Sequence, residues 1–112
     1  MCLFCDIAAG KIPSDVVFQN QRLTAFRDIK PGAPVHILVI PNEHVPSVKE
    51  AGPEHAVLIG EMALTAAELA KREGISESGF RLVFNSGADA GQSVDHIHMH
   101  LLGGRAMQWP PG

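Results

Sequence analysis

Short apolar runs separated by turn residues mark most of this 112-residue chain. Two such runs, joined by a polar turn, predict strands at Val16–Gln19 and Leu23–Arg27. Residues 35–40 are apolar on both faces apart from one histidine, which is the pattern of an interior strand covered on both sides. Residues 80–85 and 97–102 predict two further strands.

One longer segment, residues 53–73, has the period of an amphipathic helix. Pro53 suits the first helical position, and Gly74 is well placed to end the helix. Five apolar side chains fall on one face, so the helix should pack on the sheet: Leu58, Met62, Ala66, Leu69 and Ala70. Residues 2–9 predict a short helix. Because strands outnumber helices and short turns join them, we predict an α+β fold, with an antiparallel sheet of about five strands, one long helix and one short helix.

Composition narrows the class of protein. The length, a hydrophobic content of 46% and the lack of repeats predict a single globular domain, residues 1–112. The nine Lys and Arg are scattered and the net charge is −3, so we expect no nucleic acid polymer as a partner. No apolar run has membrane-spanning length, and the first residues do not resemble a signal peptide. We therefore expect a cytoplasmic protein that does not bind membranes.

Three histidines alternate near the end of the chain, at His96, His98 and His100. Alternate side chains of a strand share a face, so the three imidazoles should project together while the apolar residues between them face the core. Three histidines at this period, in a chain that holds six, indicate a functional site rather than a half-solvated strand. A single metal ion bound by all three is disfavoured, because the outer two are about 13 Å apart along an extended strand.

A ten-residue loop, residues 86–95, precedes these histidines. Long loops inside compact domains are usually functional. Gly91 permits a close backbone approach, and Gln92 and Ser93 offer donors to phosphate oxygens, although the loop lacks the Gly-Lys-Ser/Thr of a Walker motif. On composition alone, a flexible polar turn is the alternative. Together, loop and histidines predict a small nucleotide-handling enzyme.

Cys2 and Cys5 form a Cys-x-x-Cys pair at the start of the chain. In a reducing cytosol, thiols or metal ligands are more plausible than a structural disulfide. A redox pair is also open, although no strand precedes the motif as it does in thioredoxin-type proteins. The spacing alone does not decide between a redox pair, a metal site and two unrelated thiols.

The histidine segment resembles the signature of the histidine-triad (HIT) family, His-φ-His-φ-His-φ-φ with φ apolar, over residues 91–102. The likeness covers nearly the whole chain, including Phe4, Ile7, Ile12-Pro13, residues 25–29 and residues 34–41. Gly103-Gly104-Arg105 and the ending Trp109-Pro110-Pro111-Gly112 resemble the Hint branch of this family. Arg27, Ala90 and Asp95 stand where other residues are common in that branch.

This resemblance implies an enzyme that hydrolyses purine nucleoside 5′-phosphoramidates and releases AMP and an amine through a nucleotidyl-histidine. It makes His98 the nucleophile, with His100, His36 and Ser93 as further catalytic residues. The substrate-binding residues that it implies are Phe4, Ile7, Ile12 and Phe26 for the base, Asp28 for the ribose, Asn85, Gly91, Gln92, Ser93, His98 and His100 for the phosphate, and in addition Ile29 and Trp109. From the residues alone, His36 is typical of a core histidine and Asp28 of a turn.

Two alternatives are kept beside this hypothesis. One is a dinucleoside polyphosphate hydrolase of the same superfamily, against which the Hint-like ending argues. The other is a nucleotide-binding interaction module with only residual hydrolysis, which would use the same residues as the enzyme.

The resemblance also implies a metal site and an assembly. Some bacterial proteins similar to this chain carry the two cysteines together with a histidine that follows the interior strand, here His44. With His96 as the fourth ligand, Cys2, Cys5 and His44 would form the closed tetrahedral shell of a structural zinc ion, and the chemistry itself needs no cofactor. We further expect a homodimer built on the long helix and a sheet edge, with Trp109 reaching the partner's active site.

Overall fold

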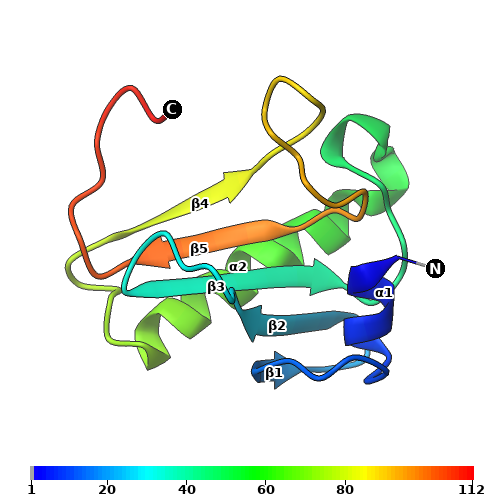
Figure 1. Cartoon of the computed structure of the whole chain (residues 1–112), viewed down its shortest axis with the longest axis horizontal. Helices are drawn as coiled ribbons and strands as arrows, with labels where there is room; N and C mark the ends of the chain where they lie inside the picture. Colours follow the sequence, from blue (N-terminus) through cyan, green and yellow to red (C-terminus); the bar gives the residue numbers. More distant parts are fainter. Residues whose placement is uncertain (1) are drawn as a thin grey trace.

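The computed structural model of the protein describes residues 2–112. In this part of the chain, five strands form one antiparallel sheet in the order β1-β2-β3-β5-β4 (Figure 1). The strands are β1 (Val16–Gln19), β2 (Leu23–Arg27), β3 (Val35–Pro41), β4 (Phe80–Phe84) and β5 (Met99–Gly103). The helices are α1 (Leu3–Ala8) and α2 (Ala56–Arg72), with two short 3₁₀ turns, η1 (Val48–Glu50) and η2 (Pro53–His55). The predicted α+β fold is therefore confirmed.

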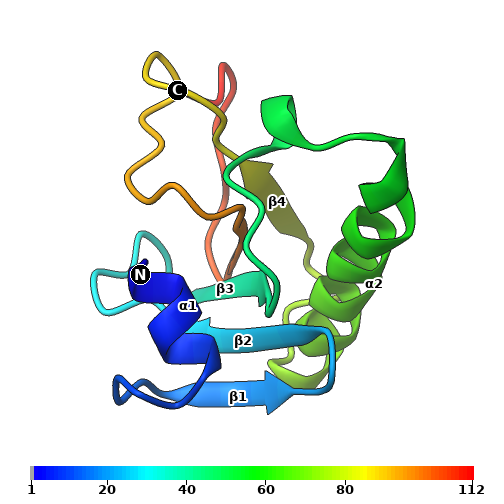
Figure 2. The same ribbon diagram turned by 90° about the vertical axis from the view of Figure 1, so that its right-hand side faces the viewer.

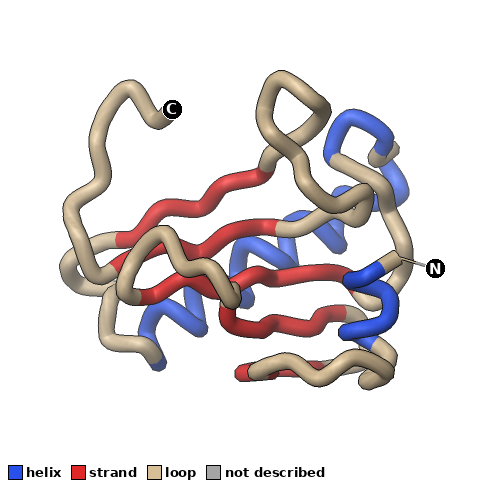
Figure 3. Tube along the Cα trace, in the orientation of Figure 1, coloured by secondary structure: helices blue, strands red, loops and turns tan. Residues whose placement is uncertain are grey.

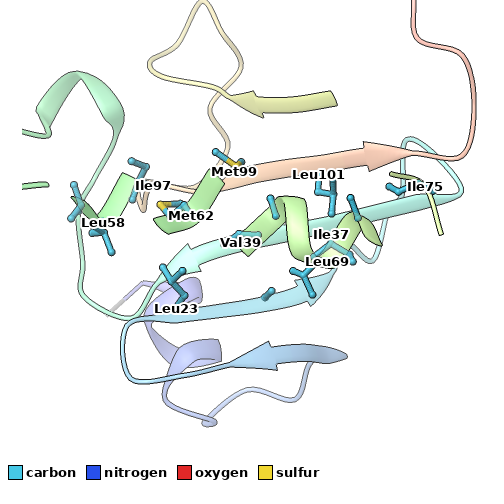
Figure 4. Close-up of a cluster of buried hydrophobic side chains, with 14 residues drawn as sticks. Leu23, Ile37, Val39, Leu58, Met62, Leu69, Ile75, Ile97, Met99 and Leu101 are labelled. Carbon is cyan, nitrogen blue, oxygen red and sulfur yellow. The ribbon is translucent and has the colours of Figure 1, made fainter. Parts of the chain in front are cut away.

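The two helices lie on opposite faces of the sheet (Figures 2 and 3). The alternation of side chains along β3 explains this arrangement, because Ile37 and Val39 pack under α2 while Leu38 and Ile40 pack with α1. Figure 4 shows the larger cluster between α2 and the sheet, which includes Leu23, Met62, Leu69 and Leu101. The interior strand is thus covered on both faces, as its two-sided apolar pattern predicts.

Helix α2 begins three residues later than its period predicts. Pro53 starts a 3₁₀ turn, in which the amide of His55 donates to the carbonyl of Gly52, and α-helical bonding begins at Ala56. The predicted stop at Gly74 is confirmed. Gly74 has a φ of +76°, and Ile75 N donates to Ala70 O in a Schellman motif. In residues 2–112, no helix is long and apolar enough to cross a membrane.

Strand β5 begins at Met99, two residues later than predicted. In the register of β3 and β5, Val39 is opposite Met99, so Ile97 would be opposite Pro41. Pro41 has no amide hydrogen, and its carbonyl accepts from the His96 ring instead, so the ladder ends there. Ile97 donates to Val45 O in the neighbouring loop. The first two histidines of the motif therefore precede the strand.

Candidate active site and metal site

A cleft of about 320 Å³ opens on the α1 side of the sheet. It lies between α1, the end of β2, the middle of β3, and the start of β5 with the segment that leads into it. Most of its lining is apolar, with a few polar side chains at one end, as is usual for a small-molecule site. The lining residues are Leu3, Phe4, Ile7, Ile12, Pro13, Ser14, Phe26, Arg27, Asp28, Ile29, Leu38, Ser93, Val94, His98 and His100.

The cleft brings together nine of the residues predicted for the substrate site: Phe4, Ile7, Ile12, Phe26, Asp28, Ile29, Ser93, His98 and His100. Ile29 is 91% exposed and lies at the rim. Leu38 and Val94 also line the cleft and were not predicted. The signal for Leu38 was available, because it lies two residues after His36 on the same strand and therefore on the same face.

Four predicted binding residues, Asn85, Gly91, Gln92 and Trp109, are not among the described residues that line the cleft. The side chain of Gln92 donates to Pro46 O at 2.7 Å and to Val94 O at 3.0 Å. These bonds use both amide hydrogens, so the expected Gln92 donor to a phosphate oxygen is not free. Gln92 instead fixes the shape of the loop before the histidines.

His98 is buried, and its ring orientation is set by the backbone. Its Nδ1 lies 2.8 Å from the carbonyl oxygen of His96. A carbonyl only accepts, so Nδ1 carries the hydrogen and Nε2 of the neutral ring keeps a lone pair. The ring also packs edge-on against Phe4 at 5.1 Å and against His100 at 5.1 Å. These contacts fix the direction of the Nε2 lone pair.

A second backbone group sets the tautomers of His36 and His100. The amide of Gly32 donates to His36 Nδ1 at 2.9 Å, so the hydrogen of the neutral His36 ring is on Nε2. His36 Nε2 lies 2.8 Å from His100 Nδ1, which must therefore accept. The hydrogen of His100 is then on Nε2, the nitrogen that remains for the cleft. His36 and His100 form a chain that ends in a donor.

Burial keeps these two rings neutral. It lowers the pKa of His36, although the nearby Asp28 carboxylate acts in the opposite direction. Burial, together with the charges of His98 and His36, lowers the pKa of His100 to about 4. At pH 7 His100 is therefore a neutral hydrogen-bond donor.

Asp28, His36 and His100 could in principle share a metal ion, since their ligand atoms lie within 4.8 Å of one another. A neutral imidazole that binds metal through Nε2 carries its hydrogen on Nδ1. In His36 that hydrogen would face the N–H of Gly32. The hydrogen-bond pattern therefore fits a donor chain and not a metal centre.

Cys2, Cys5, His44 and His96 form a second polar cluster, beside the cleft. Each sulfur lies 3.2 to 3.5 Å from the Nδ1 atoms of both histidines, close to the edge of about 3.5 Å expected for a tetrahedral zinc shell. The two sulfurs are 2.9 Å apart and would separate to about 3.7 Å around zinc, a change within reach of side-chain rotation. The cluster can hold a metal ion.

The surroundings of this cluster also suit a metal. His96 Nε2 donates to Pro41 O at 2.8 Å, which leaves Nδ1 as the lone pair that faces the sulfurs. Burial lowers the pKa of His96, so the ring is in the neutral form that ligation requires. The hydrogen bond with Cys2 and burial raise the pKa of the Cys5 thiol, a penalty that a divalent cation would remove.

Comparisons with known proteins agree with this fold and site. A family model described as "Scavenger mRNA decapping enzyme C-term binding" matches residues 1–109. The purine nucleoside phosphoramidase of Escherichia coli K12 is 50% identical over 105 residues, which is 94% of this chain and 88% of that protein. The crystal structure of a HIT family hydrolase from Legionella pneumophila superposes with a TM-score of 0.98, at 50% identity and with full coverage of both chains.

A zinc-bound histidine triad family protein from Mycobacterium smegmatis is more distant, at 28% identity and a TM-score of 0.79, with 93% of this chain and 75% of that chain covered. The fold and the histidine site define a small α+β protein of the nucleotide-handling type. Two of its three alternating histidines line a cleft, and the third belongs to a Cys/His cluster that could hold a metal ion. The chain belongs to the histidine triad (HIT) family, in its Hint branch.

Proposed function

We propose that this protein hydrolyses purine nucleoside 5′-phosphoramidates to a nucleoside 5′-monophosphate and an amine. The observation that carries the proposal is the His98 ring, whose Nε2 lone pair is fixed by the His96 carbonyl inside a cleft of nucleotide-binding character. The similarity to the E. coli purine nucleoside phosphoramidase supports the choice of the P–N bond.

The reaction has two displacements at phosphorus. The Nε2 lone pair of His98 forms a bond to phosphorus while the P–N bond of the substrate breaks, and the leaving amine takes a proton from solvent through the Ser93 hydroxyl, which lines the same cleft. Water then attacks phosphorus and gives a proton to solvent while the bond to His98 breaks, so that His98 returns to its neutral form and the monophosphate leaves. The neutral His100 donates from Nε2 to a phosphoryl oxygen as charge develops in each step.

The remainder of the cleft fits a purine nucleoside. Phe4 and Phe26 pack edge to face with ring centroids 5.5 Å apart and form an apolar wall for the base, together with Ile7 and Ile12. Asp28 lies at the polar end, where its carboxylate can accept from the ribose hydroxyls.

A side-by-side assay tests the substrate class. Purified protein is given adenosine 5′-phosphoramidate or diadenosine polyphosphate at equal concentration, and the products are separated by chromatography. We expect AMP from the phosphoramidate at least about 100-fold faster, because the 50% identical E. coli relative is a purine nucleoside phosphoramidase. Faster cleavage of the dinucleotide would favour the polyphosphate hydrolase instead. Tight AMP binding with no turnover of either would favour an interaction module.

We also propose that Cys2, Cys5, His44 and His96 hold a structural zinc ion. The donor set, the near-tetrahedral spacing and the tautomer of His96 support this assignment. The ion would tie the start of α1 to the segment before β5. Cysteines used as thiolate ligands suit a reducing compartment, in agreement with the proposed cytoplasmic location.

A homodimer is the proposed assembly. Val57 and Leu64 are large apolar residues exposed on α2, and β4 is an edge of the sheet. Trp109 is 82% exposed in the C-terminal segment, and we propose that it contacts the cleft of the partner.

Light scattering on the purified protein is expected to give twice the mass of 12.0 kDa at micromolar concentration. Leu64→Arg should shift the protein to monomer, because it places a charge in an apolar contact. Val16→Arg is the matched control, since Val16 is exposed at the opposite edge of the sheet and should leave the dimer intact. A monomeric wild type would contradict the proposal.

A further inference from the structure

The Gly103-Gly104-Arg105 turn, whose sequence resembles the Hint branch, makes contacts with a loop that has no part in the reaction steps proposed above. It begins at the last residue of β5 and lies beside the loop that precedes β3 (Figure 1). Arg105 donates to the carbonyl of Gly32 from Nε at 3.1 Å and from Nη2 at 3.0 Å. A fork of two donors on one oxygen fixes both the position and the orientation of that peptide.

Gly104 holds the same loop by close packing. Its φ is +90°, a conformation that side chains rarely adopt, and a Cβ at this position would lie 2.9 Å from the Cβ of Pro34. Gly104 and Arg105 therefore contact the loop at two points, one on each side of Ala33.

Gly32 connects this loop to the histidines. The carbonyl that accepts from Arg105 and the amide that donates to His36 Nδ1 both belong to Gly32, in the two successive peptide units joined at its Cα. If that donor moved away, the hydrogen of His36 could shift to Nδ1, and His36 Nε2 would then accept from His100. His100 would in turn present a lone pair to the phosphate in place of a hydrogen.

We propose that Gly104 and Arg105 are positioning residues for catalysis, which act through Gly32 on the tautomers of His36 and His100. The effect of this arrangement on turnover rests on the proposed function, whereas its effect on the two rings does not. The side-chain hydrogen bonds of Arg105 go to Gly32 and Ala106, neither of which lines the cleft, so its influence on the reaction passes through the loop. The guanidinium and the Gly104 backbone keep the amide of Gly32 directed at His36 Nδ1.

The ring tautomers can be measured without substrate. The sample is the zinc-loaded protein with nitrogen-labelled histidines. Nitrogen NMR of this sample distinguishes the two nitrogens of each ring by their chemical shifts. Wild type should show His36 and His100 with the hydrogen on Nε2. Arg105→Ala and Gly104→Ala should each show a mixture of tautomers in both rings. Arg105→Lys keeps a charged donor but not the fork of two donors, so its fraction of the wild-type tautomer should be intermediate.

Turnover provides the second measurement. Arg105→Ala should lower kcat about tenfold and change KM by less than about threefold, since the base and ribose contacts are intact. Two matched controls should leave the rings and kcat unchanged. Arg22→Ala removes an exposed arginine that pairs with Glu61, and Gly74→Ala strains a glycine with a φ of +76° and nothing within 4 Å of the added Cβ.

The outcomes separate the two proposals. Unchanged tautomers in Arg105→Ala and Gly104→Ala would overturn the positioning role, whatever the turnover. Changed tautomers with an unaltered kcat would overturn its catalytic importance. A wild type that shows the expected tautomers but no phosphoramidate turnover would instead contradict the proposed function.

Discussion

Replacing His98 with alanine is expected to lower phosphoramidate turnover by about four to six powers of ten, the size seen when a covalent nucleophile is removed. The structure gives a specific reason. Nε2 of His98 is the lone pair that the backbone leaves free in the cleft, whereas His100 carries a hydrogen on the corresponding nitrogen. His100 therefore cannot substitute as the nucleophile without exchanging protons with His36.

AMP binding to His98→Ala should change by less than about tenfold, because the apolar wall and Asp28 are untouched. Mass spectrometry of protein denatured during turnover should find one nucleotidyl group on wild type and none on the variant. His55→Ala is the matched control, since His55 bonds to the backbone of Gly52 away from the cleft. Near-normal turnover by His98→Ala would refute covalent catalysis.

The double variant Cys2→Ser/Cys5→Ser is expected to lose its bound zinc and to melt roughly 10 °C or more below wild type. The thiolates supply half of the ligand shell, and serine is not among the usual zinc ligands. A serine hydroxyl at position 2 can still accept the N-cap bond from the amide at position 5, so the loss of stability reports on the metal. Elemental analysis of protein purified without chelator or affinity metal should give close to one zinc per wild-type chain.

Glu43→Gln provides the control for this experiment, because it removes an exposed charge next to His44 without removing a ligand. It should retain the zinc and the melting temperature of wild type. If the double serine variant kept its zinc, or if chelated wild type melted at the same temperature as the loaded protein, the structural zinc proposal would be wrong.

The fold was largely predictable because its signals are local. The limits of β1 and β2 agree with the sequence prediction at both ends, and Gly74 ends α2 as expected. The start of β5 was not predictable from its own residues, because it depends on the partner strand. Pro41 interrupts the ladder 55 residues away from His96, and only the register of β3 and β5 reveals that they meet.

The site shows the same division between local and long-range information. The periodicity predicted that His96, His98 and His100 project together. The cleft contains His98 and His100, whereas His96 faces the two cysteines. The roles of polar side chains depend on contacts that the sequence does not show. Gln92 uses both of its amide hydrogens for the carbonyl oxygens of Pro46 and Val94. Arg27, which departs from the family branch, directs its guanidinium to Glu73 at the end of α2. These hydrogen bonds depend on neighbours that only the fold brings together, and residue type alone does not determine them.

The missing amide hydrogen of Pro41 affects which group the His96 ring contacts. A residue with an amide at that position would allow the β3–β5 ladder to continue toward the N-terminus of β5. The His96 ring would then lose its carbonyl acceptor and be drawn into the regular alternation of the strand, away from the two cysteines. In this structure His96 faces the two cysteines, whereas His98 and His100 line the cleft. The interruption of the ladder at Pro41 therefore determines which cluster His96 joins, while His98 reaches the cleft although it precedes β5.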